Sequence, residues 1–171
     1  MPRYAAFLRG VSPMNMKMPA LKRCFESAGF SGVRTLLSSG NVVFDARASS
    51  AAALQAKAEA AIEERFGARF LTIVRPVDEL REMIERDPYR RFRIAPGAKR
   101  VVTFLREPAA AKPKLPISLR EASILAADGA YAWSVYLPGP DGPVFMSLIE
   151  KVFGKDVTTR TWGTVTRCAG T

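Results

Sequence analysis

The chain has 171 residues, of which 48% are hydrophobic and 25% are charged, values typical of a soluble globular protein. It carries 26 Lys and Arg against 16 Asp and Glu, and this formal net charge of +10 favours polyanions or anionic ligands as partners. It contains no histidine, which excludes Ser-His-Asp and Cys-His catalytic arrangements and the usual nitrogen ligands of zinc, copper and non-haem iron.

The composition also predicts the compartment. No apolar run approaches the roughly 20 residues that span a bilayer. The N-terminus, MPRYAAFLRG, does not fit a signal peptide, because its apolar part is short and Arg9 interrupts it. Cys24 and Cys168 lie far apart and form no C-x-x-C motif, so we expect buried or half-buried thiols. The sequence thus predicts a cytoplasmic protein with no metal and no cofactor.

The first half of the chain alternates strand and helix signals. The expected elements are a strand over 3–8, a helix over 19–28, strands over 33–37 and 41–46, a helix over 50–66 and a strand over 70–75. Pro19 suits the first turn of a helix, and Gly67 suits the residue that ends one. The order strand, helix, strand, strand, helix, strand is that of a ferredoxin-like βαββαβ unit.

The second half predicts helices and strands in a different order. The expected elements are a helix over 76–87, a strand over 100–105, an irregular proline-rich crossing over 106–118, a hairpin over 121–138, a turn over 138–143 and a helix over 144–153. Asp128-Gly129 is a strong signal for the hairpin turn. Thr158 or Thr159 is expected to cap a last helix that carries Trp162. We expect an α+β protein with a ferredoxin-like subdomain over 1–75 and a second, smaller α+β subdomain over 76–171 packed on it.

Three stretches point to a family when they are taken together. They are FLRGV near the start, GFSGVRTLLSSGNVVF after the first helix and FGKDVTTRTWGTV near the end. In this order they make the chain resemble the bacterial proteins called domain of unknown function 1697, from Tyr4 to about Arg167. The resemblance implies an α+β fold of ferredoxin-like character and no established activity.

The chain departs from the family pattern at two places. After LRG the family usually has Ile-Asn-Val-Gly-Gly, whereas this chain has Val-Ser-Pro-Met-Asn over Val11–Asn15. After TTR the family usually has Asn-Trp-Asn-Thr, whereas this chain has Thr-Trp-Gly-Thr over Thr161–Thr164. A family role that depends on those glycines or asparagines is therefore in doubt for this chain, and the changed loop Val11–Asn15 is the larger departure.

The loop after the first strand is the first candidate site. Arg9, Gly10, Ser12, Asn15 and Lys17 are expected either to bind an anion, together with the free N–H groups of the following helix, or simply to connect strand and helix. Met14, Met16 and Met18 favour the second interpretation, since methionines fill apolar surface.

The hairpin turn is the second candidate site. Ser39, Gly40 and Asn41 either face the same ligand as Arg9 or only form the turn, because glycine and asparagine tolerate positive φ. Ser39 is a poor nucleophile, since an activated serine needs an adjacent base.

The C-terminal motif is the third candidate site. Thr158, Thr159, Arg160 and Trp162 are expected either to cap and pack a helix or to bind a carboxylate or phosphate through hydroxyls and a guanidinium. We expect Arg160 and Arg9 to converge on one anion.

A basic segment runs from Arg86 to Arg100. Its cations alternate with Tyr89 and Phe92, and the candidate nucleic-acid residues are Arg90, Arg91, Phe92, Arg93, Lys99 and Arg100. Arginines meet phosphates while bases stack on aromatic rings, so the segment predicts a nucleic-acid surface. The alternative is a solvated basic loop that Tyr89 and Phe92 anchor to the core.

These sites leave three functional hypotheses and no identifiable catalytic constellation. The first is binding of an anionic small molecule or nucleotide in a cleft between the subdomains. The second is nucleic-acid binding through the basic segment, and the third is an interaction module that dimerises through an exposed sheet edge. The sequence predicts no membrane partner, and it fixes neither the ligand nor the oligomeric state.

Overall fold

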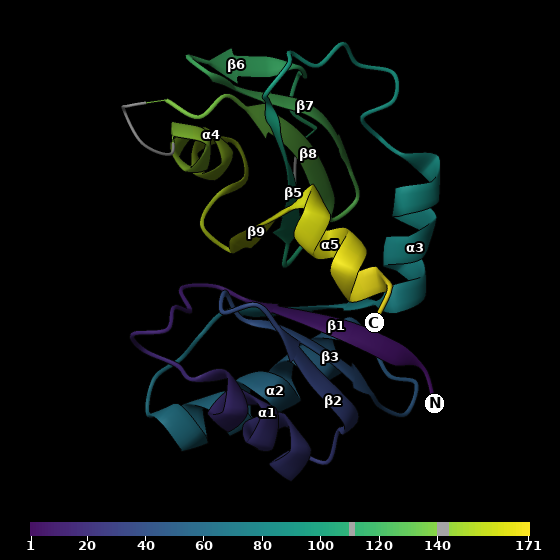
Figure 1. Ribbon diagram of the computed structural model, residues 1–171, viewed down its shortest axis with the longest axis vertical. Coiled ribbons are helices and arrows are strands. Elements are labelled where there is room, and N and C mark those ends of the chain that lie inside the picture. The colour runs from purple at the N-terminus through teal and green to yellow at the C-terminus, as the bar shows by residue number, and fades with distance from the viewer. Residues whose placement is uncertain (110–111, 140–143) are drawn as a thin grey trace. The chain divides into compact units, whose positions relative to one another are not determined.

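The computed structural model describes residues 1–109, 112–139 and 144–171, which divide into two compact units (Figure 1). The first unit joins residues 1–82 to the C-terminal segment 166–171, and the second unit is formed by residues 83–165. The division falls inside two helices, α3 (Val77–Arg86) and α5 (Trp162–Ala169). Both units combine strands and helices, which confirms the predicted α+β class.

The first unit has the ferredoxin-like arrangement. Its elements in chain order are β1 (Arg3–Leu8), α1 (Met18–Ser27), β2 (Ser31–Leu36), β3 (Asn41–Asp45), α2 (Ala51–Phe66) and β4 (Thr72–Pro76). The strands lie in the order β2-β3-β1-β4, and each neighbouring pair is antiparallel. Each helix therefore connects two strands that have one other strand between them, as the split βαβ motif requires. The predicted βαββαβ unit is confirmed.

The core of the first unit lies between its sheet and the helices α1 and α2, which cover one face (Figure 1). Three aromatic rings dominate it: Phe44 of β3 packs against Phe25 and Phe30 at centroid distances of 5.5 Å and 4.4 Å. The limits of α2 follow the sequence, since the Ser50 hydroxyl accepts a hydrogen bond from the Ala53 N–H at 3.1 Å and Gly67 ends the helix with φ 73°.

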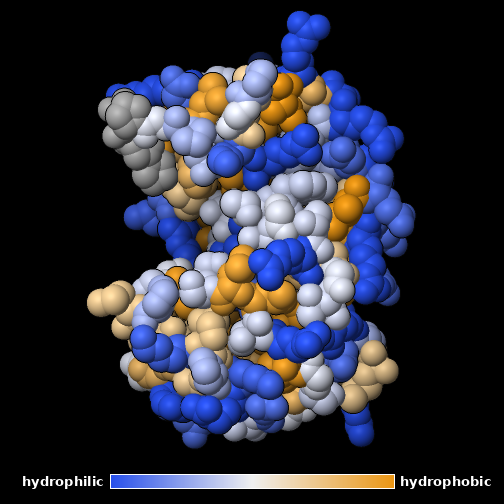
Figure 2. All heavy atoms as spheres, in the orientation of Figure 1, coloured by the Kyte–Doolittle hydropathy of each residue, from blue (hydrophilic) through white to orange (hydrophobic). Residues whose placement is uncertain are grey.

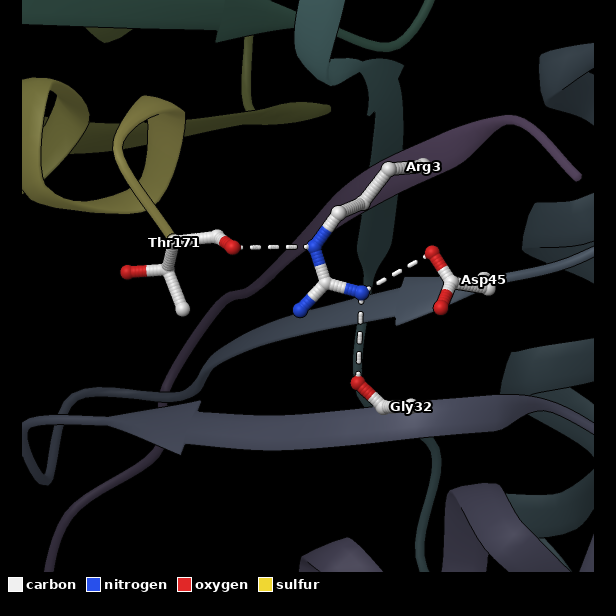
Figure 3. A network of polar contacts seen from close by, with 4 residues as sticks. All are labelled: Arg3, Gly32, Asp45 and Thr171. Atoms are coloured by element: carbon white, nitrogen blue, oxygen red, sulfur yellow. Dashed lines mark hydrogen bonds and ion pairs between the residues drawn. The ribbon is translucent and has the colours of Figure 1, made fainter.

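The C-terminal segment is hydrogen-bonded to the first unit (Figure 3). Nε of Arg3 donates to the Thr171 carbonyl oxygen at 3.1 Å. A second nitrogen of the same guanidinium donates to the Asp45 carboxylate at 2.9 Å and to the Gly32 carbonyl at 3.3 Å. Arg81 makes a parallel contact, because its Nε donates to the Ala169 carbonyl at 3.0 Å. Residues from the two ends of the chain thus belong to one unit.

The second unit is built on one antiparallel sheet. Its strands and remaining helix are β5 (Lys99–Leu105), β6 (Ile117–Leu119), β7 (Ala122–Asp128), β8 (Tyr131–Tyr136), α4 (Val144–Phe153) and β9 (Val157–Thr161). The strand order is β6-β7-β8-β5-β9. Leu148 and Ile149 of α4 pack on one face of this sheet with Ile124 and Ala132.

Two predictions for the second half are wrong. Thr158 and Thr159 do not cap the last helix, because both lie in β9, which pairs with β5. The residue that caps α5 is Thr161, whose hydroxyl accepts a hydrogen bond from the Thr164 N–H at 3.3 Å. The crossing over 106–118 is not wholly irregular either, since its end forms β6. The turn predicted over 138–143 falls largely on residues 140–143, which lie outside the described residues.

The surface mixes polar and apolar residues. On the face shown in Figure 2, hydrophobic residues reach the surface in separate groups with hydrophilic residues between them. The most exposed large hydrophobic side chains of the described residues include Met14, at 94%, and Leu37, at 47%. Within the described ranges, every helix is too short or too polar to cross a bilayer.

Candidate functional site

The loop after β1 is closed by its own hydrogen bonds. The Asn15 side chain donates to the Gly10 carbonyl at 2.8 Å and accepts from the Ser12 N–H at 2.9 Å, and the Ser12 hydroxyl accepts from the Met14 N–H at 3.2 Å. The backbone N–H groups of Asn15 and Met16 donate to the Ser12 carbonyl. These amides are therefore engaged within the loop, so they do not form a phosphate cradle. Met16 is buried, whereas Met14 is exposed, and Lys17 is exposed at the N-cap of α1.

In the hairpin turn between β2 and β3, Asn41 has a structural role. Asn41 is fully buried, and its side-chain nitrogen donates to the Leu36 carbonyl and to the Ser39 hydroxyl, both at 2.9 Å. The Gly40 carbonyl accepts from the Leu8 N–H at 2.9 Å, which joins the turn to the end of β1. The buried amide holds the turn in place, while the exposed Ser39 is the part that solvent reaches.

Strand β9 carries the threonines and the arginine of the C-terminal motif. Arg160 is 8% exposed, and one nitrogen of its guanidinium donates to the Thr158 hydroxyl at 2.8 Å and to the Thr159 carbonyl at 2.7 Å. Arg160 and Thr158 lie on one face of the strand, opposite Val102 and Phe104 of β5. Arg160 belongs to the second unit and Arg9 to the first, and their convergence on one anion stays a prediction.

Trp162 lines the same hollow as two cations of the basic segment. It is the first residue of α5, and it lines a hollow of about 320 Å³ together with Lys99 and Arg100. Its ring also meets Tyr89 edge-on at a centroid distance of 5.3 Å. Residues that belong to two different predicted sites are therefore neighbours in the second unit.

Tyr89 anchors the basic segment to the sheet. Its ring is buried, and its hydroxyl donates to the Val101 carbonyl at 2.8 Å and lies 3.2 Å from the Ser134 carbonyl oxygen. Burial raises the pKa of this hydroxyl well above its ordinary value. The Asp87 carboxylate accepts from the Tyr89 N–H at 3.1 Å, and the Arg90 N–H donates to the Asp87 carbonyl at 3.0 Å. The backbone that carries Arg90 and Arg91 is thus tightly held.

A pocket of about 690 Å³ lies beside this anchored turn. We call it the arginine pocket. Its lining comes from the end of α3, the following turn, the end of β7 and one residue of β8, and includes Met83, Arg86, Pro88, Arg90, Arg91, Ala126 and Trp133. The Trp133 indole N–H donates to the Met83 sulfur at 3.1 Å, which fixes the aromatic part of the wall. The pocket combines cations with apolar and aromatic surface, as ligand sites commonly do.

No carboxylate of the described residues pairs with the cations of the arginine pocket. Within the described residues, the guanidinium groups of Arg86, Arg90 and Arg91 have no hydrogen-bond or ion-pair partner, although Arg91 lies over the Phe92 ring at 4.8 Å. Two carboxylates, Asp87 and Asp128, also line the pocket, so its lining keeps a positive surplus. Unpaired guanidiniums are well suited to carboxylate or phosphate, which they bind in bidentate fashion.

The described residues give no metal centre. Across 1–109, 112–139 and 144–171, no three Cys, Asp or Glu side chains gather as metal ligands. Cys24 and Cys168 are both buried, and burial raises the pKa of the Cys24 thiol above its ordinary value. These thiols are packed in the protein interior.

Residues 1–123 match a protein-family model described as "Protein of unknown function (DUF1697)". The chain belongs to this family. The matched range covers the LRG and SGNVVF motifs, while the TTRTW motif lies beyond it. No curated protein matches the sequence.

A solved structure shares the fold of this DUF1697 protein. It is described as the conserved bacterial protein SP0830 from Streptococcus pneumoniae, and it matches with a TM-score of 0.71 at 18% sequence identity. The match covers 99% of this chain and 97% of the other. At this identity the likeness establishes the fold and leaves the function open.

The sequence identified the basic segment but not the pocket it helps to form. Arg90 and Arg91 were candidates, whereas Arg86, Trp133 and the end of β7 were not. Arg86 carried a usable signal, because it belongs to the same charge run. Trp133 and Ala126–Asp128 carried none, since only the pairing of β7 with β8 places them at the pocket.

Proposed function

We propose that this DUF1697 protein binds an anionic ligand in the arginine pocket. The observation that carries the proposal is a set of three guanidiniums that make no hydrogen bond or ion pair with the described residues and that lie around apolar and aromatic surface. Cations that no carboxylate neutralises remain available to an external anion. The apolar wall favours an anion joined to a flat or apolar body, and a nucleotide is one such molecule.

Binding is tested with defined probes. Thermal unfolding is followed with ATP, AMP, pyrophosphate and benzoate, because a ligand at about 100 times its Kd adds roughly 2.7 kcal/mol of stability. We expect at least one probe to raise the melting temperature and to bind about tenfold more weakly to Arg90→Gln and Arg91→Gln. Arg93→Gln is the matched control, since Arg93 lies in the same exposed segment but does not line the pocket. Equal losses in all three variants would contradict the proposed site.

Nucleic-acid binding through the basic segment is the second candidate function. It is favoured by the exposure of all five cationic side chains, Arg90, Arg91, Arg93, Lys99 and Arg100. The buried Tyr89 cannot stack on a base, which leaves the half-buried Phe92 as the aromatic candidate, and most of the affinity would come from phosphate contacts. Such binding weakens steeply with salt, with a log–log slope of about −0.7 per contacted phosphate for single strands. A small anion that binds only in the arginine pocket gives a shallow slope of log affinity against log salt concentration, so a salt titration separates the two candidates.

A further inference from the structure

Within the described residues, the second half of strand β7 has an open edge, because no strand pairs with it on the side away from β8. Strand β6 pairs only with Ala122–Ile124, whereas β7 continues to Asp128. The register of β7 against β8 shifts between Ile124 and Ala126, as at a β-bulge. Beyond the β7–β8 ladder, residues Leu125–Asp128 make no hydrogen bond with the described part of the chain. Alternate residues of a strand direct their N–H and C=O groups to opposite sides, so this edge presents backbone groups that can pair with another strand.

A pocket lies on each face of the sheet at this open edge. The arginine pocket includes Trp133, and a second pocket of about 460 Å³, which we call the proline pocket, includes Pro113, Leu115 and Phe153. Leu115 and Phe153 pack against the cluster that contains Ala132. Because Ala132 and Trp133 are consecutive in β8, their side chains point to opposite faces. Ala126–Asp128 and Arg91 line both pockets, so the two pockets meet along the edge.

The two pockets differ in chemistry. Arg86 and Arg90 line only the arginine pocket, whereas Leu115, Leu125 and Phe153 give the proline pocket an apolar wall. Lys112 adds a cation to the proline pocket, and Arg91 reaches both. The acidic residues of the two linings are Asp87 and Asp128, which leaves a positive surplus along the edge. Side chains of an added strand alternate between the faces, so an acidic side chain would enter one pocket and an apolar side chain the other.

We propose that an extended acidic peptide adds to this sheet as a strand along Leu125–Asp128, with alternating acidic and apolar side chains in the two pockets. Strand addition supplies affinity through main-chain hydrogen bonds and specificity through the alternate side-chain pockets. A second copy of this chain is disfavoured as the occupant, because it would bring the same positive surplus against the edge. The inference rests on the proposed function and extends it, since the acidic side chains would occupy the arginine pocket.

The test uses an acetylated and amidated hexapeptide of alternating Glu and Val with the full-length protein. We expect measurable binding by fluorescence anisotropy, with backbone amide shifts confined to Leu125–Asp128 and their neighbours in an NMR titration. Arg91→Gln should weaken the peptide about tenfold, and Arg93→Gln should leave it unchanged. The same peptide with Gln in place of Glu should bind about tenfold more weakly, because its charge is removed.

N-methylation of the peptide separates strand addition from simple charge attraction. Only every second N–H of an added strand faces β7, so methylating one alternate set of amides should abolish binding and methylating the other should leave it intact. Equal effects of the two sets, or no binding of the hexapeptide, would overturn the inference. The proposed function is tested independently of the peptide, because it predicts that small anions bind in the arginine pocket even if no peptide binds. Failure of the peptide to bind would therefore leave the proposed function standing. If the protein instead dimerises as its concentration rises, and Arg91→Gln abolishes the dimer, the occupant of the edge is a second copy of the chain. That result would also overturn the inference.

Discussion

Tyr89 shows how one buried side chain positions the candidate site. Its hydroxyl meets backbone carbonyls of two neighbouring strands, β5 and β8, while its backbone N–H meets the Asp87 carboxylate. The ring therefore joins the turn that carries Arg90 and Arg91 to the sheet that carries the opposite wall of the arginine pocket. The position of the cations depends on an aromatic residue that does not itself line the pocket.

We predict that Tyr89→Phe destabilises the protein in a pH-dependent way. At pH 7 the loss of the hydroxyl should lower the free energy of unfolding by about 1 kcal/mol. In the folded protein the Tyr89 pKa lies above its unfolded value of about 10. Above pH 10 the unfolded chain thus releases this proton before the folded one does, and wild-type stability falls as pH rises. The difference between wild type and variant should shrink above pH 10, by up to about 1.4 kcal/mol per pH unit. Urea unfolding between pH 7 and 11 measures it, and a constant difference would contradict the prediction.

At the scale of the elements, the glycine in the β2–β3 hairpin, Gly40, can be compared with the glycine that ends α2, Gly67. Gly40 has φ 85°, and a Cβ there would lie 3.0 Å from the Val11 Cβ and 3.1 Å from the Leu8 Cβ. Gly67, which ends α2, has φ 73° but no atom within 4 Å of such a Cβ. The two glycines share a left-handed backbone and differ in the space around them.

We predict that Gly40→Ala costs more stability than Gly67→Ala. Each substitution places a side chain in the left-handed region, which costs about 1–2 kcal/mol. Only Gly40→Ala also displaces the backbone and side chains at the end of β1, so its cost should exceed that of Gly67→Ala by at least 1 kcal/mol. Denaturant unfolding of the two variants at pH 7 measures the difference. Equal costs would show that the Leu8 and Val11 region yields freely.

The elements also show where sequence patterns are sufficient. The βαββαβ unit was predictable because β1 and β3 are largely apolar, its helices have clear limits and Gly67 stands where α2 ends. Strand β9 was missed because its polar residues, the buried Thr158 and Arg160 and the half-buried Thr159, lie within a sheet, whereas the threonines were interpreted as helix caps. The available signal for a strand was the run of β-branched residues in Val157–Thr161, all of which except Arg160 are valine or threonine. Strand β6 has three residues and follows a proline, which is too little pattern to identify.

At the scale of the whole molecule, the candidate site depends on strand register that the sequence does not state. The basic segment could be found from its charges alone, whereas the open edge of β7 follows from where β6 ends against it. A change of one residue in that pairing would move every side chain of the strand to the other face. A run of charges can therefore be identified from the sequence, whereas the residues that complete the pocket around it are brought together only by the tertiary fold.

Residues from both ends of the chain lie in the first unit, where Arg3 holds the C-terminal segment. The Arg3 guanidinium donates to Thr171, Asp45 and Gly32 at once, which its forked geometry allows (Figure 3). Arg3→Lys keeps the charge, but a single ammonium cannot reach all three acceptors in the same geometry. Because this ion pair is partly exposed, we expect a loss of only about 1 kcal/mol in global stability. The amides of 166–171 should nevertheless exchange hydrogen about tenfold faster, because the segment loses one of its attachments. Hydrogen exchange of Arg3→Lys is compared with that of Arg47→Lys, whose arginine is exposed and lies in the loop after β3. Unchanged exchange in 166–171 would show that Arg81 and the packing of α5 hold the segment without Arg3.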